Sequence, residues 1–366
     1  MRLKQKLKHW LVQTEAYRYY WDASILRNEK KRLISEAKDL IANLDVSASK
    51  QTLLAKYIID FKKYRFSFNE WHYLYHLESA TEDYKREFIS RSYGQKWYRR
   101  TIDFKVREIF HNKRKFLQFL KNKDLLHREF MFIDKGDKNN EKALEDFIQR
   151  KDIVLKPSCG TCGSGIFIMK RNSEPENEVA DIINKTGGSE YIAEECIGGH
   201  PDVQKIHPSS LNSIRVVTSY DGAEYKLQFA ILRCGSGGNF LDNFHANGYC
   251  CIVNAETGCL EGKAIDFNGK LCERHPDTGV VFDSIKIPCW DKVKASCLNL
   301  HRSFDIPFVG WDVCVTSGEE VEFIEANHAP DVDIVQSVTG LGFAEEFKRV
   351  CKGFRHHSML RKFKFN

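Results

Sequence analysis

Short runs of strand-forming residues follow one another from about residue 150 onward, and they limit the folds that the chain can adopt. The runs are DIVLK, GIFIMK, YIAEECI, SIRVVTSY, YKLQFAILR, YCCIVNA, DVCVT and VEFIEAN. Glycines and short polar residues separate them, which is typical of turns between strands. The TSGEE segment between the last two runs predicts a hairpin turn. We therefore expect largely antiparallel strand pairing in this part of the chain.

The chain before about residue 125 has a different pattern, which predicts helices. Apolar residues recur at helical spacing in residues 53–61, and no proline interrupts this part of the chain. Ser67 precedes Glu70 by three positions and Ser79 precedes Glu82 by three, so both pairs fit capping boxes at helix starts. Many Tyr, Phe and Trp residues suggest helices packed through aromatic side chains. The predicted fold class is α+β with a helical N-terminal region.

The composition of the 366 residues is that of a globular protein, long enough for about two or three domains. Hydrophobic residues make up 42% and charged residues 29% of the chain, and no run approaches the roughly 18 apolar residues that a membrane span requires. The first residues are basic, but Gln13, Thr14 and Glu15 interrupt the apolar run that a secretory signal needs. We therefore expect a cytoplasmic protein.

The formal net charge is +6, and much of the excess lies in the basic blocks RNEKKR, KWYRR and HNKRK. Such blocks are usually solvated helix faces, although they also attract anions such as nucleotides, phosphosugars and lipid headgroups. We expect no stable nucleic-acid partner, and a transient association with a membrane surface stays open.

Twelve cysteines could suggest disulfides, but disulfide frameworks belong mainly to small secreted domains. Cys234, Cys250, Cys251 and Cys314 lie in strand-like apolar runs, where reduced thiols pack as small apolar groups. We expect reduced cysteines in the core.

The segment IVLKPSCGTCGSGIFIMK, residues 153–170, holds Cys159 and Cys162 in a C-x-x-C spacing together with several glycines. A structural zinc site normally needs four N or S ligands, and the sequence contains no second C-x-x-C pair. Redox dithiols lie where a strand runs into a helix, whereas this segment lies between two strand-like runs. We favour a glycine loop whose backbone approaches phosphates closely. A plain glycine hairpin is the alternative.

The stretch GWDVCVTSGEEVEFIEANHAP carries oxygen-bearing side chains on two strands joined by a turn. Glu325 and Asn327 are two positions apart and so share one face of a strand, and Asp312 lies roughly across the hairpin. Such oxygen ligands suit Mg²⁺, which proteins usually share with substrate phosphates. Apolar neighbours indicate that the carboxylates are buried and need a cation. The alternative is an exposed polar face of an antiparallel sheet.

Several of these motifs, in this order, resemble the ATP-grasp superfamily. They are Lys-Pro-Ser with its glycine loop, YIAEECIGG, GWDV and IEAN. The segments HPSSLNSIRVVT and NFHANGYCCIVNAETGCL look more specifically like the sugar-transfer-associated ATP-grasp family, which is found with surface-polysaccharide genes. The resemblance covers roughly residues 110–350. It implies ATP and Mg²⁺ as cofactors and two α+β subdomains that sandwich ATP: a small one at 111–190 and a large one at 191–366. Residues 1–110 would form the helical N-terminal region.

The resemblance also implies which residues bind the nucleotide. Lys156 matches the strand lysine that contacts the phosphates, and Lys113 matches the earlier lysine, with Lys115 as a near competitor. Residues 158–165 resemble the phosphate lid, whose expected contacts are Ser158, Gly160, Thr161, Gly163, Ser164 and Gly165.

The hinge that binds adenine and ribose would comprise Glu194 and Glu195 with the backbone of Cys196 and Ile197. We favour Glu194 for the adenine amino group, because it holds the matching place in IAEECI. By the same resemblance, Asp312, Glu325 and Asn327 are the magnesium ligands.

Arg215 lies in the family-specific SLNSIRVVT strand and is expected to face the γ-phosphate or an acyl phosphate, with help from Asn212. A structural salt bridge is the alternative role for Arg215. His245 lies in the NFHANG turn, where substrate contact and turn structure are both open. Many ATP-grasp enzymes begin with a Rossmann-like domain, but no strand–glycine–helix pattern appears in residues 1–110, so the acceptor pocket is poorly defined.

The resemblance implies an ATP-dependent carboxylate–amine ligase. A carboxylate would attack the γ-phosphate to form an acyl phosphate and ADP, and an amine would then displace phosphate. The expected setting is capsule, O-antigen or exopolysaccharide synthesis, with one substrate an amino acid or other amine and the other a sugar derivative. Two alternatives remain at this stage: a kinase on the same scaffold, and a non-enzymatic basic protein that binds nucleic acid or a membrane surface.

Overall fold

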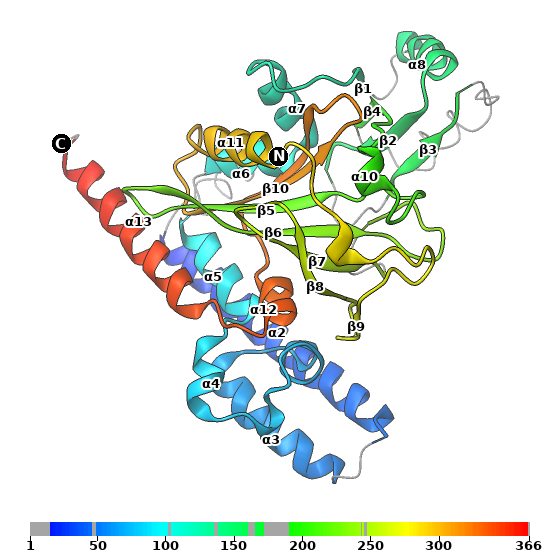
Figure 1. The fold of residues 1–366 in the computed structure, drawn as a ribbon. Helices are drawn as coiled ribbons and strands as arrows, with labels where there is room; N and C mark the ends of the chain where they lie inside the picture. The colour runs from blue at the N-terminus through cyan, green and yellow to red at the C-terminus, as the bar shows by residue number, and fades with distance from the viewer. Residues whose placement is uncertain are drawn as a thin grey trace. The chain divides into compact units, whose positions relative to one another are not determined.

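The computed structural model describes residues 15–45, 49–101, 104–134, 138–159, 165–171, 190–242, 244 and 247–364. The chain divides into two compact units, drawn as ribbons in Figure 1. Unit 1 comprises residues 1–100, 331–336 and 341–344. Unit 2 comprises residues 101–330, 337–340 and 345–366.

Unit 1 is helical, as the sequence predicts. Its elements are α2 (Glu15–Asn43), α3 (Lys50–Tyr64), the π-helical turn η1 (Asn69–Leu74), the 3-10 turn η2 (Leu77–Ser79), α4 (Glu82–Glu87), α5 (Arg91–Thr101) and the first part of α12 (Asp333–Thr339). Aromatic side chains fill its core, which confirms the expected packing. The rings of Tyr57 and Trp71 are both buried, with centroids 5.5 Å apart, and Phe61, Phe66 and Phe68 are buried around them.

One of the two predicted capping boxes in unit 1 is confirmed and the other is wrong. The backbone N–H of Ser67 donates to Glu70 Oε2 at 2.7 Å, and the N–H of Glu70 donates to Ser67 Oγ at 3.2 Å. Ser79 does not cap α4, because it ends the preceding 3-10 turn. Thr81, directly before the helix, accepts from the N–H of Tyr84 at 3.3 Å and takes the capping role.

Unit 2 contains two sheets, and all the strand pairs described in it are antiparallel, as the sequence predicts. The small sheet has the order β1 (Phe130–Ile133), β4 (Tyr191–Glu195), β2 (Ile153–Pro157) and β3 (Phe167–Met169). The large sheet has the order β11 (Val321–Asn327), β10 (Phe308–Val315), β5 (Ile214–Tyr220), β6 (Tyr225–Cys234), β7 (Tyr249–Val253), β8 (Leu260–Ile265) and β9 (Leu271–Cys272). The predicted hairpin around TSGEE is the β10–β11 pair.

The helices of unit 2 pack on the faces of the two sheets. They are α6 (Phe104–His111), α7 (Lys113–Lys121), α8 (Lys138–Arg150), the short α10 (Pro201–Gln204), the 3-10 turn η4 (Phe282–Ser284), α11 (Trp290–His301) and α13 (Ala344–Lys364). Leu144 and Phe147 of α8 pack on Ile153, Leu155 and other apolar side chains of the small sheet. The apolar face of α11 packs on the large sheet, as Figure 1 shows. The opposite face of the small sheet remains for polar side chains, whereas that of the large sheet is partly covered by α13, whose Phe347 stacks on Phe308 of β10 with ring centroids 5.2 Å apart.

His301, at the end of α11, is fully buried and has both ring nitrogens in hydrogen bonds. Nδ1 lies 2.8 Å from Thr218 Oγ1, which also accepts from the indole N–H of Trp311, and Nε2 lies 3.0 Å from the carbonyl oxygen of Ile306. Burial is the main cause that lowers the pKa of His301 to about 4. The neutral ring therefore holds this part of the core together.

We expect this histidine to make the fold sensitive to acid. The unfolded chain takes up the proton near pH 6.5 and the folded chain only near pH 4, so stability is lost as the pH falls through this range, by up to about 3 kcal/mol. Urea unfolding at pH 7.5 and pH 4.5 should show a smaller pH-dependent loss in His301→Gln than in the wild type. His127→Gln, at an exposed histidine, serves as the control, and equal losses in all three proteins would contradict the expectation.

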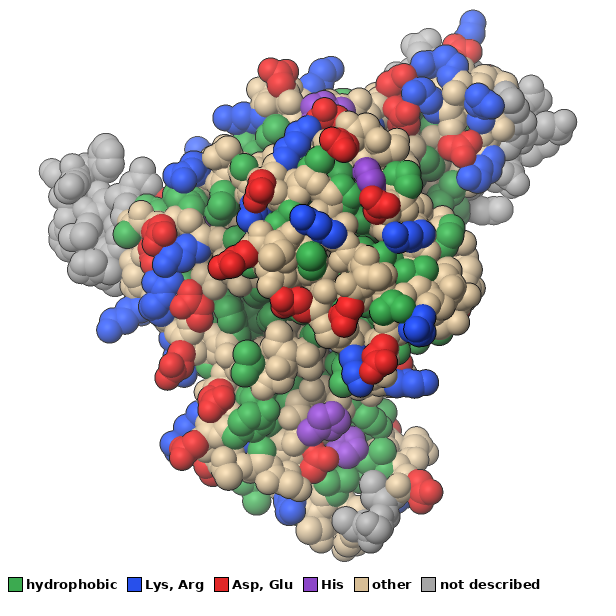
Figure 2. Space-filling view, in the orientation of Figure 1, with side chains coloured by type: hydrophobic (Ala, Val, Ile, Leu, Met, Phe, Trp, Pro, Cys, Tyr) green, Lys and Arg blue, Asp and Glu red, His purple; other side chains and the backbone are tan. Residues whose placement is uncertain are grey.

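None of the helices in the described part of the chain combines the length and apolar character needed to cross a bilayer. On the face drawn in Figure 2, Lys and Arg side chains are interspersed with Asp and Glu side chains. This face therefore has the mixed charge of an ordinary solvated surface and not the basic stripe typical of a nucleic-acid interface.

Candidate active site

The face of the small sheet opposite α8 carries charged side chains. Leu155 and Ala193 point toward α8, so the alternate residues Lys156 and Glu194 point to the other face. Both are buried, and Lys156 Nζ lies 2.5 Å from Glu194 Oε1. The strand lysine and the glutamate that the sequence predicts at the nucleotide site are thus brought together as a buried ion pair.

Arg128, just before β1, extends this pair, and no sequence motif marks it. Its Nε donates to Glu194 Oε2 at 2.6 Å, and its Nη1 donates to Glu322 Oε2 of β11 at 2.5 Å. Burial acts to raise the pKa of Glu194, but Arg128 and Lys156 outweigh it and hold that pKa at about 2. Burial lowers the pKa of Lys156, although Glu194 opposes this effect. The result is a buried group of ionised side chains on the face where the phosphates are expected.

The predicted lid joins β2 to β3, which pair as an antiparallel hairpin. Gly160, Thr161, Gly163 and Ser164 lie outside the described residues, and so does Cys162. Gly165 has φ 75°, a left-handed conformation that favours glycine. Ser158 is buried, and its hydroxyl has no hydrogen-bond partner among the residues that the structure describes. A buried hydroxyl without a protein partner fits a phosphate oxygen as its acceptor, and the lid role stays a prediction.

The predicted hinge follows Glu194 directly. Glu195 faces away from Lys156 and its Oε1 lies 2.7 Å from Lys151 Nζ. The backbone N–H of Glu195 donates to the Glu129 carbonyl at 2.9 Å, and that of Cys196 donates to the Asp152 carbonyl at 2.8 Å. To contact a nucleotide base, either N–H group would therefore have to give up its present hydrogen bond to a backbone carbonyl. The roles of Glu194, Glu195, Cys196 and Ile197 in binding adenine and ribose stay predictions.

The large sheet brings the predicted magnesium residues together on one face. Asp312 of β10 is directly opposite Glu325 of β11, and Asn327 is opposite Gly310. On its other side Asp312 is opposite Arg215 of β5, which binds both carboxylate oxygens, one of them at 3.0 Å from Nη2. The structural salt bridge considered for Arg215 is therefore present, at the predicted site.

A second arginine, Arg233 of β6, also contacts Asp312, and sequence reasoning does not single it out. Its Nη2 lies 3.1 Å from Asp312 Oδ2 and 2.7 Å from Ser213 Oγ. Burial acts to raise the pKa of Asp312, but the two guanidinium groups outweigh it and lower that pKa. Asp242 also acts electrostatically on Arg233, so Arg215, Arg233 and Asp312 belong to a group of mixed charge. The only sequence signal for Arg233 is its place at the end of YKLQFAILR, where a charged residue follows core residues of the strand.

Gly310 makes the approach of Arg215 to this face possible. A Cβ atom at residue 310 would lie 3.2 Å from Arg215 Cδ and 2.9 Å from Pro330 Cβ. A side chain at residue 310 would therefore crowd Arg215 beside Asp312. The glycine is needed here for space next to the ion pair, since residue 310 lies in a strand and not in a turn.

Lys113 connects the two clusters. It begins α7, its backbone N–H donates to the Ser158 carbonyl at 2.8 Å, and its Nζ lies 3.6 Å from Glu325 Oε1. Lys115 instead forms an ion pair with Glu108 at the surface. The geometry therefore favours Lys113 over Lys115 as the earlier nucleotide lysine.

The acidic residues fit a magnesium ion that is shared with a ligand. Within the described part of the chain, no group of three or more His, Cys, Asp and Glu side chains is placed to hold a metal by itself. Asp312 and Glu325 supply two carboxylates on neighbouring strands, and Asn327 adds an amide oxygen. Few protein ligands, completed by phosphates and water, are typical of Mg²⁺ in phosphoryl-transfer sites. The metal assignment of these three residues stays a prediction.

Asn212 lies before β5, but the structure directs its side chain into the protein. It adopts φ 53°, its Nδ2 donates to the carbonyls of Val203 and His207, and its Oδ1 accepts from Ser210 Oγ at 2.8 Å. Ser210 Oγ in turn lies 2.8 Å from His207 Nδ1. These contacts of the HPSSLN motif build the turn that leads into the Arg215 strand, so Asn212 acts on the site through the backbone. His245 lies outside the described residues.

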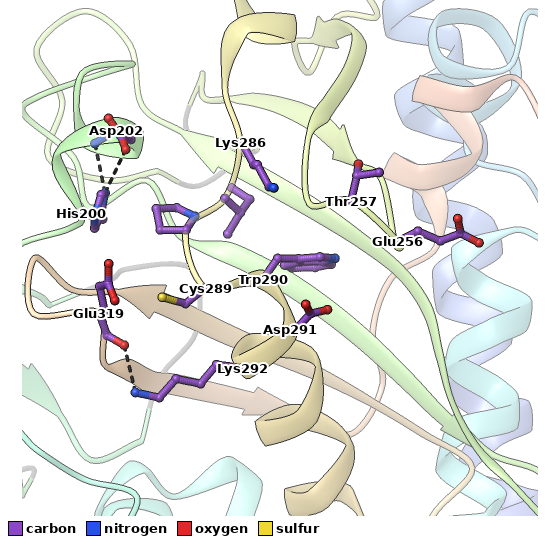
Figure 3. A pocket seen from close by; sticks show the side chains of 12 residues that line it. His200, Asp202, Glu256, Thr257, Lys286, Cys289, Trp290, Asp291, Lys292 and Glu319 are labelled. Atoms are coloured by element: carbon purple, nitrogen blue, oxygen red, sulfur yellow. Dashed lines mark hydrogen bonds and ion pairs between the residues drawn. The ribbon is translucent and has the colours of Figure 1, made fainter.

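A cavity of about 600 Å³ lies elsewhere in unit 2, at the start of α11. Figure 3 shows its lining, which includes His200, Lys286, Cys289, Trp290 and Glu319. It contains none of the predicted site residues. Among its lining residues, His200 Nδ1 lies 3.6 Å from the Asp202 carboxylate and Lys292 donates to the Glu319 carbonyl at 3.0 Å.

Comparison with known proteins identifies the family. The model of the sugar-transfer associated ATP-grasp family matches residues 90–352. No curated protein matches the chain in sequence. Solved structures similar to this chain include the D-alanine–D-alanine ligase of Helicobacter pylori, with 12% identity, a TM-score of 0.45 and 70% of this chain aligned. The ATP complex of the Bacillus anthracis enzyme has 14% identity, a TM-score of 0.42 and 70% of this chain aligned to 69% of its own.

A further similar structure is the ATP-grasp ligase PsnB with its minimal precursor, with 11% identity, a TM-score of 0.43 and alignment over 72% of this chain and 68% of that one. The chain spans 64% of the length of the Helicobacter pylori ligase. The family match covers more than two thirds of the present chain and confirms the predicted family and fold. The predicted enzyme class, an ATP-grasp ligase, agrees with this family. The chain belongs to the sugar-transfer associated ATP-grasp family.

Proposed function

We propose that the chain is an ATP-dependent carboxylate–amine ligase that modifies a sugar or polysaccharide precursor in capsule, O-antigen or exopolysaccharide synthesis. The observation that carries the proposal is the contact of Lys113 with Glu325. It joins the face with Lys156 and Glu194 to the face with Asp312 and Arg215, so that cations for a nucleotide and oxygen ligands for its metal converge. A reaction that consumes ATP also fits the expected cytoplasmic location.

In the proposed reaction the chain supplies position and charge. Lys113 and Lys156 hold the phosphates, while Asp312, Glu325 and Asn327 hold Mg²⁺, which would neutralise phosphate charge. Arg215 and Arg233, beside Asp312, stabilise the negative charge that develops on the transferred phosphoryl group. This arrangement explains why no protein nucleophile is required.

Two steps account for all bonds. A carboxylate oxygen of the donor bonds to the γ-phosphorus while the bond to the β-phosphate oxygen breaks, which releases ADP. The amine nitrogen then bonds to the acyl carbon, the carbon–oxygen bond to phosphate breaks, and the amine loses a proton to solvent. A closed lid formed by residues 158–165 would keep water from the acyl phosphate. We assign residues 111–190 to the small subdomain, 191–366 to the large one and the helical residues 1–110 to acceptor binding.

The test follows oxygen from the donor carboxylate. Candidate sugar acids and amino acids labelled with ¹⁸O in the carboxylate are incubated with the protein and Mg·ATP, and the released phosphate is analysed by mass spectrometry. The proposal requires ADP release that depends on both substrates and ¹⁸O in the phosphate. ADP release with a stable phosphorylated hydroxyl and no free phosphate would instead identify a kinase, and no nucleotide binding at all would leave the basic-protein alternative.

The cysteines of the lid are expected to be dispensable. The Cys159→Ser, Cys162→Ser double variant replaces each thiol by a hydroxyl of similar size, so we expect it to retain ADP release and nucleotide affinity within about threefold, because a ΔΔG of a surface substitution is usually within about 0.5 kcal/mol. The same assays with and without a chelator check the result. A large loss of activity in a folded variant would indicate that Cys159 and Cys162 act as a redox or metal-binding dithiol.

A further inference from the structure

Four ionised side chains form a continuous buried series in unit 2. Lys156 contacts Glu194, Glu194 contacts Arg128, and Arg128 contacts Glu322. Their side chains are 8%, 4%, 2% and 1% exposed, in that order. The series runs from β2 and β4 of the small sheet to β11 of the large sheet, three residues before Glu325.

This arrangement gives Glu194 two cations. Lys156 faces one carboxylate oxygen and Arg128 the other. Without a ligand the four charges balance, because Lys156 offsets Glu194 while Arg128 offsets Glu322 and also contacts Glu194. The contact of Arg128 with Glu194 is therefore additional to the balance of the unliganded site. It becomes necessary when Lys156 turns toward a phosphate, because a buried carboxylate left without a counterion is strongly unfavourable.

Arg128 is suited to this task by its geometry. A planar guanidinium can hold two carboxylates at once, which a single ammonium group does less well. The backbone N–H of His127 donates to Glu322 Oε1 at 3.0 Å and fixes the far end of the contact. Arg128 Nη2 is buried without a hydrogen-bond partner among the described residues. The guanidinium is therefore not placed for maximal stability alone, since an unpaired buried donor is costly.

We propose that Arg128 is a positioning residue for triphosphate binding. It holds Glu194 in place and balances its negative charge, so that the charge of Lys156 becomes available to the phosphates of a nucleoside triphosphate. This inference rests on the proposed function, because it takes the phosphates to bind at Lys156.

The test compares two variants that differ only at Arg128. Glu322→Gln keeps the contact of Arg128 with Glu194. The double variant Arg128→Met, Glu322→Gln removes the cation without leaving Glu322 unpaired, so its unliganded state still contains the neutral pair of Lys156 and Glu194. Affinities for Mg·AMP-PNP and for adenosine, which has no phosphate, are measured by calorimetry, and urea unfolding of each variant shows whether it is folded.

We expect Glu322→Gln to bind Mg·AMP-PNP within about threefold of the wild type. The double variant should bind it about 30-fold more weakly, which corresponds to about 2 kcal/mol. Its affinity for adenosine should stay within about threefold, because a ligand without phosphates leaves Lys156 paired with Glu194. A purely structural defect would weaken both ligands. Arg128→Lys, which keeps a cation beside Glu194, should recover most of the loss.

Two results would overturn the inference: equal Mg·AMP-PNP affinity in the double variant and in Glu322→Gln, or an equal loss for adenosine. If the double variant does not fold, Arg128→Lys and Arg128→Gln decide, since the inference requires the first to bind Mg·AMP-PNP clearly more tightly than the second. Failure of the wild type to bind Mg·AMP-PNP would overturn the proposed function itself, and can be distinguished because it appears before any variant is compared.

Discussion

Lys156→Ala should reduce ATP turnover by about 100- to 1,000-fold, the loss typical of removing one charged or donor group at a reacting phosphate or oxyanion. The lysine is buried on the face that carries Glu194, and its Nζ lies 2.5 Å from that carboxylate. Alanine removes the cation expected to meet the phosphates. Of the two cations that contact Glu194, Arg128 then remains. Affinity for Mg·AMP-PNP should fall with the rate, which calorimetry measures without knowledge of the acceptor.

Lys151→Ala is the matched control for this variant. Lys151 precedes β2, is partly exposed and contacts Glu195 at 2.7 Å on the other side of the strand. We expect its nucleotide affinity to stay within about threefold of the wild type, as for an exposed ion pair. If both lysine variants bind Mg·AMP-PNP as the wild type does, Lys156 is not the phosphate lysine.

The double variant Asp312→Asn, Glu325→Gln should abolish the magnesium dependence of nucleotide binding and lower turnover by at least about 100-fold. Both substitutions keep the side-chain shape and remove the negative charge that a magnesium ion requires. Asp312 also balances Arg215 and Arg233, so its loss should lower the free energy of unfolding by about 3 kcal/mol, at the lower end of the cost of breaking a buried pair. Mg²⁺ titrations of AMP-PNP affinity and urea unfolding measure the two effects separately.

Glu320→Gln provides the comparison on the same hairpin. Glu320 is exposed in the turn and pairs with Lys292 at 2.8 Å, so we expect neither the magnesium dependence nor turnover to change. Undiminished magnesium-dependent turnover in the Asp312, Glu325 variant would reject the metal assignment. A loss of stability without a change in magnesium dependence would leave Asp312 a purely structural residue.

The sequence predicts most of the fold because the determining patterns are local. Short runs of strand-forming residues between glycines and polar turns identify the strands, and the turn in TSGEE identifies the β10–β11 hairpin. The reciprocal contacts of Ser67 and Glu70 follow from a spacing of three residues. The error at Ser79 has a local cause as well, because Thr81 lies nearer the helix start and captures the free N–H group.

The charged network at the site could be predicted only in part. Arg128 meets Glu194 across 66 positions of the chain and Glu322 across 194. Arg233 reaches Asp312 by lying on the second strand away from it. Such pairs depend on the order of strands within each sheet and, for Arg128 and Glu322, on the packing of the two sheets. No spacing within one segment indicates them. The polar character of Asn212 was also insufficient to predict where its side chain points, because its amide donates hydrogen bonds to backbone carbonyls of the turn before β5.

The two arginines on Asp312 have a consequence for the order in which ligands arrive. Both oxygens of this carboxylate are engaged by guanidinium groups, so a bare divalent cation would have to displace them and would leave two positive charges facing it. A cation that arrives already attached to a polyphosphate brings its own anions, and these give Arg215 and Arg233 new partners at the moment Asp312 is released. Under the proposed metal assignment, the site would therefore admit metal and nucleotide as one species, and the free ion alone would be a poor competitor.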